Sequence, residues 1–234
     1  MNYVFDVDGT LTPSRGVIDP EFKKWFTEFA ENNPVYLVTG SDLAKTVEQL
    51  GEDLVKKVTY SFNCAGNAVY SKGELVYQSD WTLPLDVREF LESHLKTSPY
   101  PHKYGLHLEE RIGLLNYSVV GRKAVGDQRT AYYLWDKEHG ERQWLVEQIN
   151  TRWPEIQAAA GGETGVDIFA RGCDKAQVLK YITGNIYFFG DRIDPAGNDW
   201  SIAQAIIDQH RGRCYNVGSW TDTFNLLKEI CETS

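Results

Sequence analysis

The decapeptide YVFDVDGTLT at residues 3–12 constrains this chain more than any other stretch. A short apolar run ends in two aspartates, Asp6 and Asp8, and Gly9 then allows a sharp turn. The pattern predicts a buried strand ending at Phe5 that delivers both acids to the edge of an open α/β sheet, where ligands collect. Side chains two residues apart in an extended segment point the same way, so we expect the acids to share one cation, with Mg²⁺ as the natural candidate. For a bare DxDG, the alternative is an acidic turn without chemistry.

The remaining segments before residue 80 and after residue 172 continue a βα rhythm. Asp19 and Pro20 resemble an N-cap and first turn, and Phe22, Trp25, Phe26 and Phe29 follow at helical spacing. A strand over 35–38 leads to Ser41, which we expect to cap a helix that ends at Gly51. A strand over 58–62 and a hairpin follow. Further helices are expected over 174–184, 199–210 and 221–232, with strands over 185–191 and 214–217. The pattern predicts a doubly wound, Rossmann-like α/β core formed by residues 1–79 and 173–234.

The rhythm changes between residues 80 and 172. A helix over 84–97 precedes a Pro-rich turn, two strand-like runs (GLHLEERI and GLLNYSVVG), and a long helical segment over 128–152. This segment is interpreted as an inserted α+β domain, because the doubly wound pattern resumes only afterwards.

Composition narrows the class of partner. The net charge of −9 argues against nucleic acid as the main partner, although clustered arginines can still bind a small anion. No basic leader and no apolar run of membrane-spanning length is visible, so we expect a soluble, cytoplasmic protein with no membrane partner. The four cysteines lack metal-site or disulfide-framework spacing and are interpreted as ordinary thiols: Cys64, Cys173, Cys214 and Cys231.

Four short stretches, DVDGTLT, VTGSD, GCDK and GDRIDPAGND, stand at predicted strand ends in the order of the haloacid dehalogenase superfamily, which this chain resembles. Read alone, Ser41 is equally well an N-cap, Lys175 a solvated side chain, and Asp194 part of a turn. The resemblance implies that Asp6 is the phosphate-accepting nucleophile and Asp8 the acid and base. It further implies that Ser41 contacts phosphate and that Lys175 holds nucleophile and phosphate by charge. The implied ligands of Mg²⁺ are Asp6, Asp8 and Asp191, supported by Asn198 and Asp199.

Most of the chain resembles the eukaryotic-type phosphomannomutases, whose core carries an inserted cap of the C2 type. The matching stretches include DVDGTLTPSR, EERIGLLNYSVVGR, GGETGVDIFARGCDK and YFFGDRIDPAGND. The resemblance implies a Mg²⁺-dependent interconversion of hexose 6-phosphate and hexose 1-phosphate, with mannose preferred and a hexose 1,6-bisphosphate activator. A place in GDP-mannose biosynthesis and a homodimer formed through the cap are also implied. The implied substrate-binding residues are Arg15, Arg111, Arg122, Arg129, Asp167 and Thr39.

Three positions depart from the family pattern. TGSD replaces the usual GGSD, which favours Ser41 as the motif hydroxyl, and AGN replaces ENG after the third strand. Gly165 replaces the serine two residues before Asp167, so one expected hydroxyl is missing, with Thr164 adjacent. These departures leave open a sugar-phosphate phosphatase that releases the phosphoryl group to water. A separate alternative, from another class of protein, is a non-catalytic phosphosugar-binding module.

Overall fold

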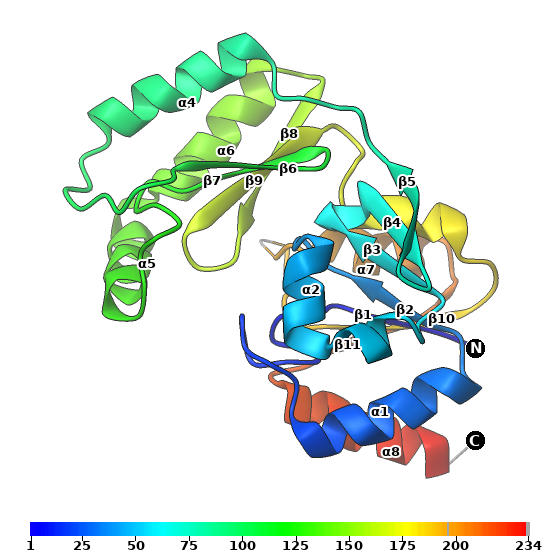
Figure 1. Cartoon of the computed structure of the whole chain (residues 1–234). Coiled ribbons are helices and arrows are strands. Elements are labelled where there is room, and N and C mark those ends of the chain that lie inside the picture. The colour runs from blue at the N-terminus through cyan, green and yellow to red at the C-terminus, as the bar shows by residue number, and fades with distance from the viewer. Residues whose placement is uncertain (196, 233–234) are drawn as a thin grey trace. The chain divides into compact units, whose positions relative to one another are not determined.

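A computed structural model describes residues 1–195 and 197–232 and divides the chain into two compact units (Figure 1). The core unit contains residues 1–78, 173–195 and the chain from 199 onward. The inserted unit contains residues 79–172, and a short segment ending at Asn198 groups with it. One unit is therefore built from two distant parts of the chain, and the other from the stretch between them.

The core unit is organised around a seven-stranded sheet in the order β11-β10-β1-β2-β3-β4-β5. The first five strands of this order are parallel, and β4 and β5 are antiparallel additions at one edge. The strands are β1 (Asn2–Phe5), β2 (Val35–Val38), β3 (Tyr60–Asn63), β4 (Ala68–Ser71), β5 (Glu74–Gln78), β10 (Ile186–Gly190) and β11 (Gly212–Asn216). β1 lies between β10 and β2, so the first and last thirds of the chain meet at the centre of the sheet.

Helices cover both faces of this sheet, as the alternation along β1 requires. Tyr3 and Phe5 pack into one apolar cluster with helices α1, α2, α3 and α8, whereas Val4 packs into a second cluster with η2 and α7. The helices are α1 (Pro20–Asn32), α2 (Leu43–Leu50), α3 (Glu52–Val55), α7 (Trp200–Asp208) and α8 (Trp220–Glu232), with 3₁₀ turns η1 (Cys64–Gly66) and η2 (Lys175–Tyr181). The predicted α/β fold is confirmed.

Two local predictions in the core unit were wrong. Ser41 does not cap α2; Asp42 does, because its carboxylate accepts a hydrogen bond from the Lys45 amide at 2.8 Å. The predicted helix over 174–184 is a 3₁₀ segment, although its expected cap is present: Asp174 accepts from the Ala176 amide at 2.8 Å.

The inserted unit contains a four-stranded antiparallel sheet in the order β6-β7-β9-β8. Its strands are β6 (Leu108–Arg111), β7 (Leu114–Tyr117), β8 (Ile156–Gly161) and β9 (Gly165–Ala170), and its helices are α4 (Leu85–Thr97), α5 (Asp127–His139) and α6 (Glu141–Arg152). The single helix predicted over 128–152 is in fact two, because Gly140 adopts a left-handed conformation (φ 67°) between them. Strands β8 and β9 were not predicted.

One face of the inserted sheet packs against helices. Tyr117 and Leu115 of β7 and Ile168 of β9 point into an apolar cluster formed with α4, α5 and α6. The intervening residues Asn116 and Asp167 therefore point to the opposite face. Figure 1 shows α4 and α6 on one side of this sheet. The opposite face is the one that carries polar side chains.

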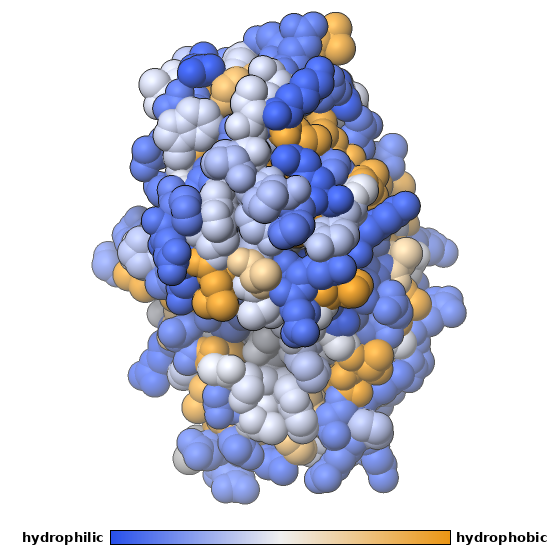
Figure 2. All heavy atoms as spheres, turned by 90° about the vertical axis from the view of Figure 1, so that its left-hand side faces the viewer, coloured by the Kyte–Doolittle hydropathy of each residue, from blue (hydrophilic) through white to orange (hydrophobic). Residues whose placement is uncertain are grey.

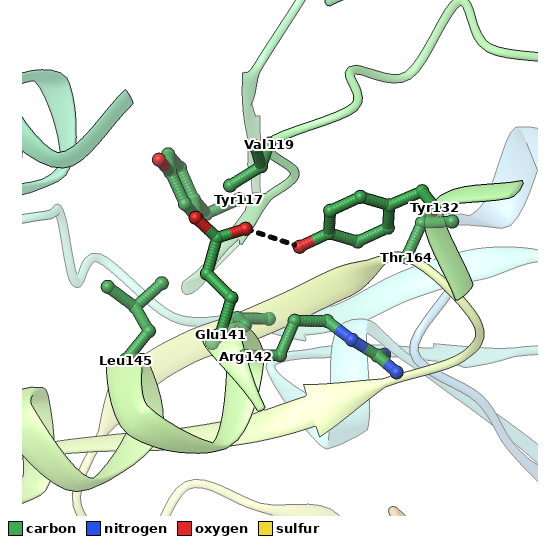
Figure 3. A pocket seen from close by; sticks show the side chains of 8 residues that line it. Tyr117, Val119, Tyr132, Glu141, Arg142, Leu145 and Thr164 are labelled. Carbon is green, nitrogen blue, oxygen red and sulfur yellow. Dashed lines mark hydrogen bonds between the residues drawn. The ribbon is translucent and has the colours of Figure 1, made fainter. Parts of the chain in front are cut away.

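A buried acid lies beneath the helices of the inserted unit (Figure 3). The Tyr132 hydroxyl donates to Glu141 Oε2 at 3.1 Å, and His94 Nδ1 contacts the Tyr117 hydroxyl at 2.9 Å. His94 Nε2 is 3.5 Å from Glu141 Oε1, too far for a good hydrogen bond. Burial raises the pKa of Glu141, opposed by hydrogen bonds from Ser98 and Tyr132, and burial lowers the pKa of His94. The site therefore favours neutral side chains.

The surface and the lengths of the helices can be compared with what a membrane-spanning segment requires. Figure 2 shows hydrophobic residues as small separate groups among hydrophilic ones on the face it presents. Within the described part of the chain, no helix is long and apolar enough to cross a membrane. A membrane-spanning helix is therefore not found among residues 1–195 and 197–232.

The raised pKa of Glu141 predicts a pH-dependent stability difference. A carboxyl whose folded pKa lies above its unfolded pKa stabilises the protein fully below the unfolded value and loses that contribution as pH rises through the folded one. Glu141→Gln stays neutral, so we expect it to gain about 1–3 kcal/mol of unfolding free energy over the natural protein at about pH 8. At about pH 4 the advantage should disappear. Urea unfolding at both pH values measures it.

Glu138→Gln is the matched control, because Glu138 is an exposed glutamate on α5. Its effect should stay within about 0.5 kcal/mol at both pH values. A Glu141→Gln effect that does not change with pH would contradict the assignment of a buried, proton-favouring site.

Candidate active site

Asp6 lies where β1 ends, at the centre of the core sheet. Its backbone amide donates to the Phe189 carbonyl at 2.9 Å, which continues the pairing of β1 with β10 by one residue. Asp191 directly follows β10, so the parallel pairing brings both acids to the same edge of the sheet. The predicted delivery of Asp6 to a strand end is what the structure shows.

Lys175 joins the two ends of the chain at this edge. Its Nζ contacts Asp6 Oδ1 at 2.5 Å and Asp199 Oδ1 at 2.6 Å, and all three side chains are almost fully buried. Burial alone would lower the pKa of Lys175, but the charges of Asp199 and Asp6 outweigh it and raise the pKa. The lysine is thus held in its charged form between two carboxylates.

Three acids converge around this lysine: one carboxylate oxygen each of Asp6, Asp191 and Asp199 lie within 4.8 Å of one another. Burial raises the pKa of Asp6, with Lys175 opposing and the other two acids adding to it. Burial and the charge of Asp199 raise the pKa of Asp191 to about 6. Burial is thus the main cause of both shifts, and the neighbouring carboxylates add to it. An all-oxygen donor set of this kind fits a hard divalent cation.

Asp199 differs from the other two acids in its contacts. Its Oδ1 accepts from Lys175, and its Oδ2 accepts from the Arg192 amide at 3.2 Å. Asp6 and Asp191 are therefore the acids best placed to hold a cation, with Asp199 positioning the lysine. Asn198, the half-buried residue just before Asp199, was predicted as a supporting ligand, and that role stays a prediction.

Asp8 lies apart from this group. Its Oδ1 accepts from the Arg15 amide at 2.5 Å and from Gln49 Nε2 at 2.9 Å. Among the described residues, the group of three converging acids does not include Asp8, and its role beside Asp6 stays a prediction. Gly9, the next residue, packs closely against Asp191, because a side chain there would meet Asp191 Oδ2 at 2.4 Å.

The second motif lies at the end of β2. Thr39 is buried, and its hydroxyl accepts from the Ser41 amide at 3.1 Å. Ser41 is half-buried, and the capping of α2 is performed by Asp42 instead. The side chain of Arg15, the remaining predicted core residue, is exposed, and its backbone has a positive φ of 58°.

Three arginines predicted to bind substrate lie in the inserted unit. Arg111 ends β6, and its guanidinium contacts Glu109 Oε2 at 2.5 Å. Arg122 Nε contacts the same oxygen at 2.9 Å. Arg129 begins the first turn of α5 and pairs with Glu163 at 3.4 Å. Arg111 and Arg122 are thus brought together, and both are anchored by a residue that the sequence did not single out.

Asp167 lies on the polar face of the inserted sheet. Asn116 Nδ2 donates to its Oδ1 at 2.6 Å across β7 and β9. The departure at Gly165 has a local counterpart, because a side chain there would meet Asn116 Nδ2 at 2.6 Å. Thr164 does not replace the missing hydroxyl on this face: it is buried and lines the pocket around Glu141 (Figure 3).

Sequence reasoning missed three residues that hold predicted site residues in place. Gln49 orients Asp8, Asn116 orients Asp167, and Glu109 orients two arginines. Asn116 and Glu109 lie inside the quoted stretch EERIGLLNYSVVGR, and the alternation of its two strands could have placed them on the polar face. Gln49 carried no such signal, because it looks like an ordinary helix residue.

The fold defines the class. The core unit, with its acids beyond the central strands, has the architecture of haloacid dehalogenase-like proteins. A haloacid dehalogenase-like hydrolase from Bacteroides thetaiotaomicron matches 97% of this chain and 98% of its own, with a TM-score of 0.62 at 13% identity. The C-terminal domain of trehalose-6-phosphate phosphatase from C. albicans matches 93% of this chain and 79% of its own, with a TM-score of 0.60 at 14% identity. At these identities the likeness establishes the fold.

Sequence comparison defines the family. The profile described as eukaryotic phosphomannomutase matches residues 22–233. A phosphomannomutase from Saccharomyces cerevisiae is 34% identical over 97% of this chain and 92% of its own length. A probable phosphomannomutase from Caenorhabditis elegans is 35% identical over 85% of this chain and 84% of its own. The chain belongs to the eukaryotic phosphomannomutase family, and the resemblance found in its motifs is confirmed.

The buried lysine makes a stability prediction. In Lys175→Met two buried carboxylates lose the cation that contacts them, so we expect the unfolding free energy to fall by about 3–5 kcal/mol in buffer without divalent cations. Denaturant titration measures the change. Lys24→Met, on the exposed side of α1, is the control and should change stability by less than about 0.5 kcal/mol. Equal losses in the two variants would show that the buried ion pairs do not hold the core together.

Proposed function

We propose that this protein is a phosphomannomutase-type enzyme that interconverts hexose 6-phosphate and hexose 1-phosphate, with mannose phosphates preferred. The observation that carries the proposal is the buried Asp6–Lys175 contact beside Asp191, in a chain of the eukaryotic phosphomannomutase family. Lys175 fixes one oxygen of Asp6 and offsets negative charge at the point where a phosphoryl group would arrive. Phosphoryl transfer depends mainly on such positioning and charge stabilisation.

Asp6 is assigned as the nucleophile. Its carboxylate attacks phosphorus, the bond between phosphorus and the sugar oxygen breaks, and the sugar oxygen takes up a proton. Asp8 is assigned as the donor of that proton and as the base in the reverse step. Two hydrogen bonds hold its Oδ1, so Oδ2 is the oxygen we assign to proton transfer. In the other half-reaction, the free hydroxyl of a hexose monophosphate gives its proton to Asp8 and attacks the aspartyl-phosphate, the bond between Asp6 and phosphorus breaks, and a hexose 1,6-bisphosphate forms. This bisphosphate turns around and returns its other phosphoryl group to Asp6.

Mg²⁺ is the proposed metal. Asp6 and Asp191 would hold it, with Asp8, Asn198 and Asp199 as the other predicted contributors, and it would supply neutralisation of phosphoryl oxygen charge. Ser41 and Thr39 are assigned to phosphate contact at the end of β2. Support comes from the convergence of carboxylates and from the raised pKa of Asp191.

The inserted unit is proposed to bind the rest of the substrate. Guanidinium groups bind phosphate in a bidentate manner and stay charged, so Arg111, Arg122 and Arg129 are assigned to the second phosphate, with Arg15. Asp167 is assigned to a sugar hydroxyl. The unit would also keep water from the aspartyl-phosphate, so that a hexose 1,6-bisphosphate is formed and reused.

A second candidate function is hydrolysis of the same substrates. Gly165 favours it, because the family's serine is missing and the Asn116 side chain lies where a side chain at 165 would extend.

The predicted homodimer, cytoplasmic location and role in GDP-mannose biosynthesis stay predictions. Exposed residues that a partner could cover on the inserted helices are Leu85, Leu134 and Trp144.

One pair of assays decides between these functions. The purified protein is given mannose 1-phosphate, Mg²⁺ and glucose 1,6-bisphosphate, and mannose 6-phosphate and free phosphate are measured in parallel. We expect isomerisation to exceed phosphate release. Phosphate release without isomerisation would establish the phosphatase, and tight binding without turnover would establish the binding module.

The nucleophile assignment predicts the behaviour of a matched pair of variants. Asp6→Asn should lower turnover by at least about 1,000-fold, because an amide cannot form the acyl phosphate. Asp53→Asn removes an exposed carboxylate that pairs with Lys23 and should leave turnover within about twofold. Persistence of turnover in Asp6→Asn would refute the assignment.

The metal assignment predicts a difference between two neighbouring acids. Asp191→Asn should weaken Mg²⁺ binding by about tenfold or more, measured by calorimetry, because it removes a ligand from the converging group. Asp194→Asn, at an exposed position three residues later, should change the affinity by less than about twofold. Similar losses in both variants would point to general electrostatics in place of a defined site.

A further inference from the structure

We propose that Glu109 is a positioning residue that holds Arg111 and Arg122 in the orientation needed to bind a phosphate. The inference rests on the proposed function, because it concerns the residues assigned there to the second phosphate. It adds a residue that neither the motifs nor the family resemblance assigned. The carrying observation is that a single carboxylate oxygen, Glu109 Oε2, contacts both guanidiniums, at 2.5 and 2.9 Å.

Backbone geometry brings these three side chains together. Glu109 and Arg111 are two residues apart on β6, so their side chains point to the same face of the sheet. Arg122 reaches them because the loop after β7 turns back along the chain before β6. Three hydrogen bonds fix this return: Tyr104 amide to Val120 carbonyl, Ser118 amide to His107 carbonyl, and Arg122 amide to Leu106 carbonyl, at 2.8, 2.8 and 2.9 Å.

The face on which they lie is the polar one. In the sheet register Glu109 is opposite Asn116, which in turn is opposite Asp167. The residues on either side, such as Leu115, point instead into the apolar cluster beneath the helices. Glu109 therefore shares its face with the residues assigned to phosphate and sugar binding, and it has no part in the apolar core.

Charge explains why an acid is needed here. Two guanidiniums around one point repel each other, and long arginine side chains lose rotamer freedom when a ligand fixes them. A carboxylate between them offsets the repulsion and orders both side chains before the ligand arrives. A guanidinium has five N–H donors and can bind a phosphate in a bidentate manner, and the contacts to Glu109 Oε2 come from Nη2 of Arg111 and Nε of Arg122.

The exposed fractions of the three side chains agree with an arrangement in which Glu109 holds the two arginines. The side chains of Arg111 and Arg122 are 13% and 17% exposed, whereas that of Glu109 is 31% exposed. The next residue, Glu110, points to the opposite face and pairs with Arg88 of α4. Two adjacent glutamates of the same strand thus each hold arginine, but only Glu109 holds the arginines on the polar face, which makes Glu110 a matched control.

The first test compares steady-state kinetics of Glu109→Gln and Glu110→Gln with mannose 1-phosphate as substrate. We expect Glu109→Gln to raise KM by about tenfold and to change kcat by less than about threefold, because it weakens binding without touching the reacting atoms. Glu110→Gln should leave both constants within about twofold. Glu109→Asp, which keeps the charge, should recover part of the lost affinity.

Two results would overturn the proposal. A lower KM in Glu109→Gln would show that the carboxylate competes with phosphate for the arginines. An unchanged KM together with a lower melting temperature would show a purely structural role.

A second measurement separates failure of this inference from failure of the proposed function. Lack of turnover by the natural protein would refute the function alone. Inorganic phosphate can still be titrated into the natural protein and both variants, following the arginine Nε–H signals by NMR. We expect the dissociation constant to rise about tenfold in Glu109→Gln only, with faster exchange of the Arg122 Nε–H. Identical titrations in all three proteins would refute the inference.

Discussion

The contact of Lys175 with Asp6 and Asp199 is the interaction on which the core site depends. It joins residues from opposite ends of the chain, with all three side chains withdrawn from water. A buried ion pair of this kind is rarely retained for stability alone, because the cost of removing charges from water offsets much of the attraction. Its value here is positional: it fixes one oxygen of Asp6 and leaves Asp191 facing the same point.

In the inserted unit, too, side chains assigned to the substrate are held in place by neighbouring residues. Arg111 lies at the end of β6 and Arg122 lies in a loop, and side chains at such places are mobile unless another residue holds them. Glu109 holds the two arginines, and Asn116 holds Asp167 on the same face of the sheet. In the inserted unit, therefore, Arg111, Arg122 and Asp167 are each held by a residue that has no assigned contact with substrate.

Much of this arrangement could be predicted from the sequence, and the reasons for the misses are specific. The apolar run before Asp6 and the aromatic spacing after Pro20 gave the correct strand and helix, because burial of one face imposes a period that is visible in the residues. The split at Gly140 was missed because a left-handed residue can continue directly into a second helix with similar composition. Strand β8 was missed because its run of alanines carries weak strand preference. Strand β9 contains Val166, Ile168 and Phe169, which favour a strand, and its sequence could have revealed it.

The site was predictable in its members but less so in its contacts. Motif order named Asp6, Lys175 and Asp191 correctly as neighbours, since parallel strands share one edge. The contacts of Asp8 were not predictable from alternation, because the chain leaves the strand after Phe5 and the Asp8 carboxylate then accepts from the Arg15 amide and the Gln49 side chain. A residue such as Gln49, which orients a site residue from another element, is not part of a sequence motif. Any side chain of suitable length at that place in the fold could make the same contact.

The place at which the chain is interrupted has an evolutionary consequence. The insertion leaves the core after β5, an antiparallel strand at the sheet's outer edge, and returns at residue 173, before η2. The central strands β10, β1 and β2 are formed entirely outside it. Descendants could therefore exchange or reshape the inserted segment, to which we assign substrate recognition, while inheriting unaltered the core strands that position Asp6 and Asp191.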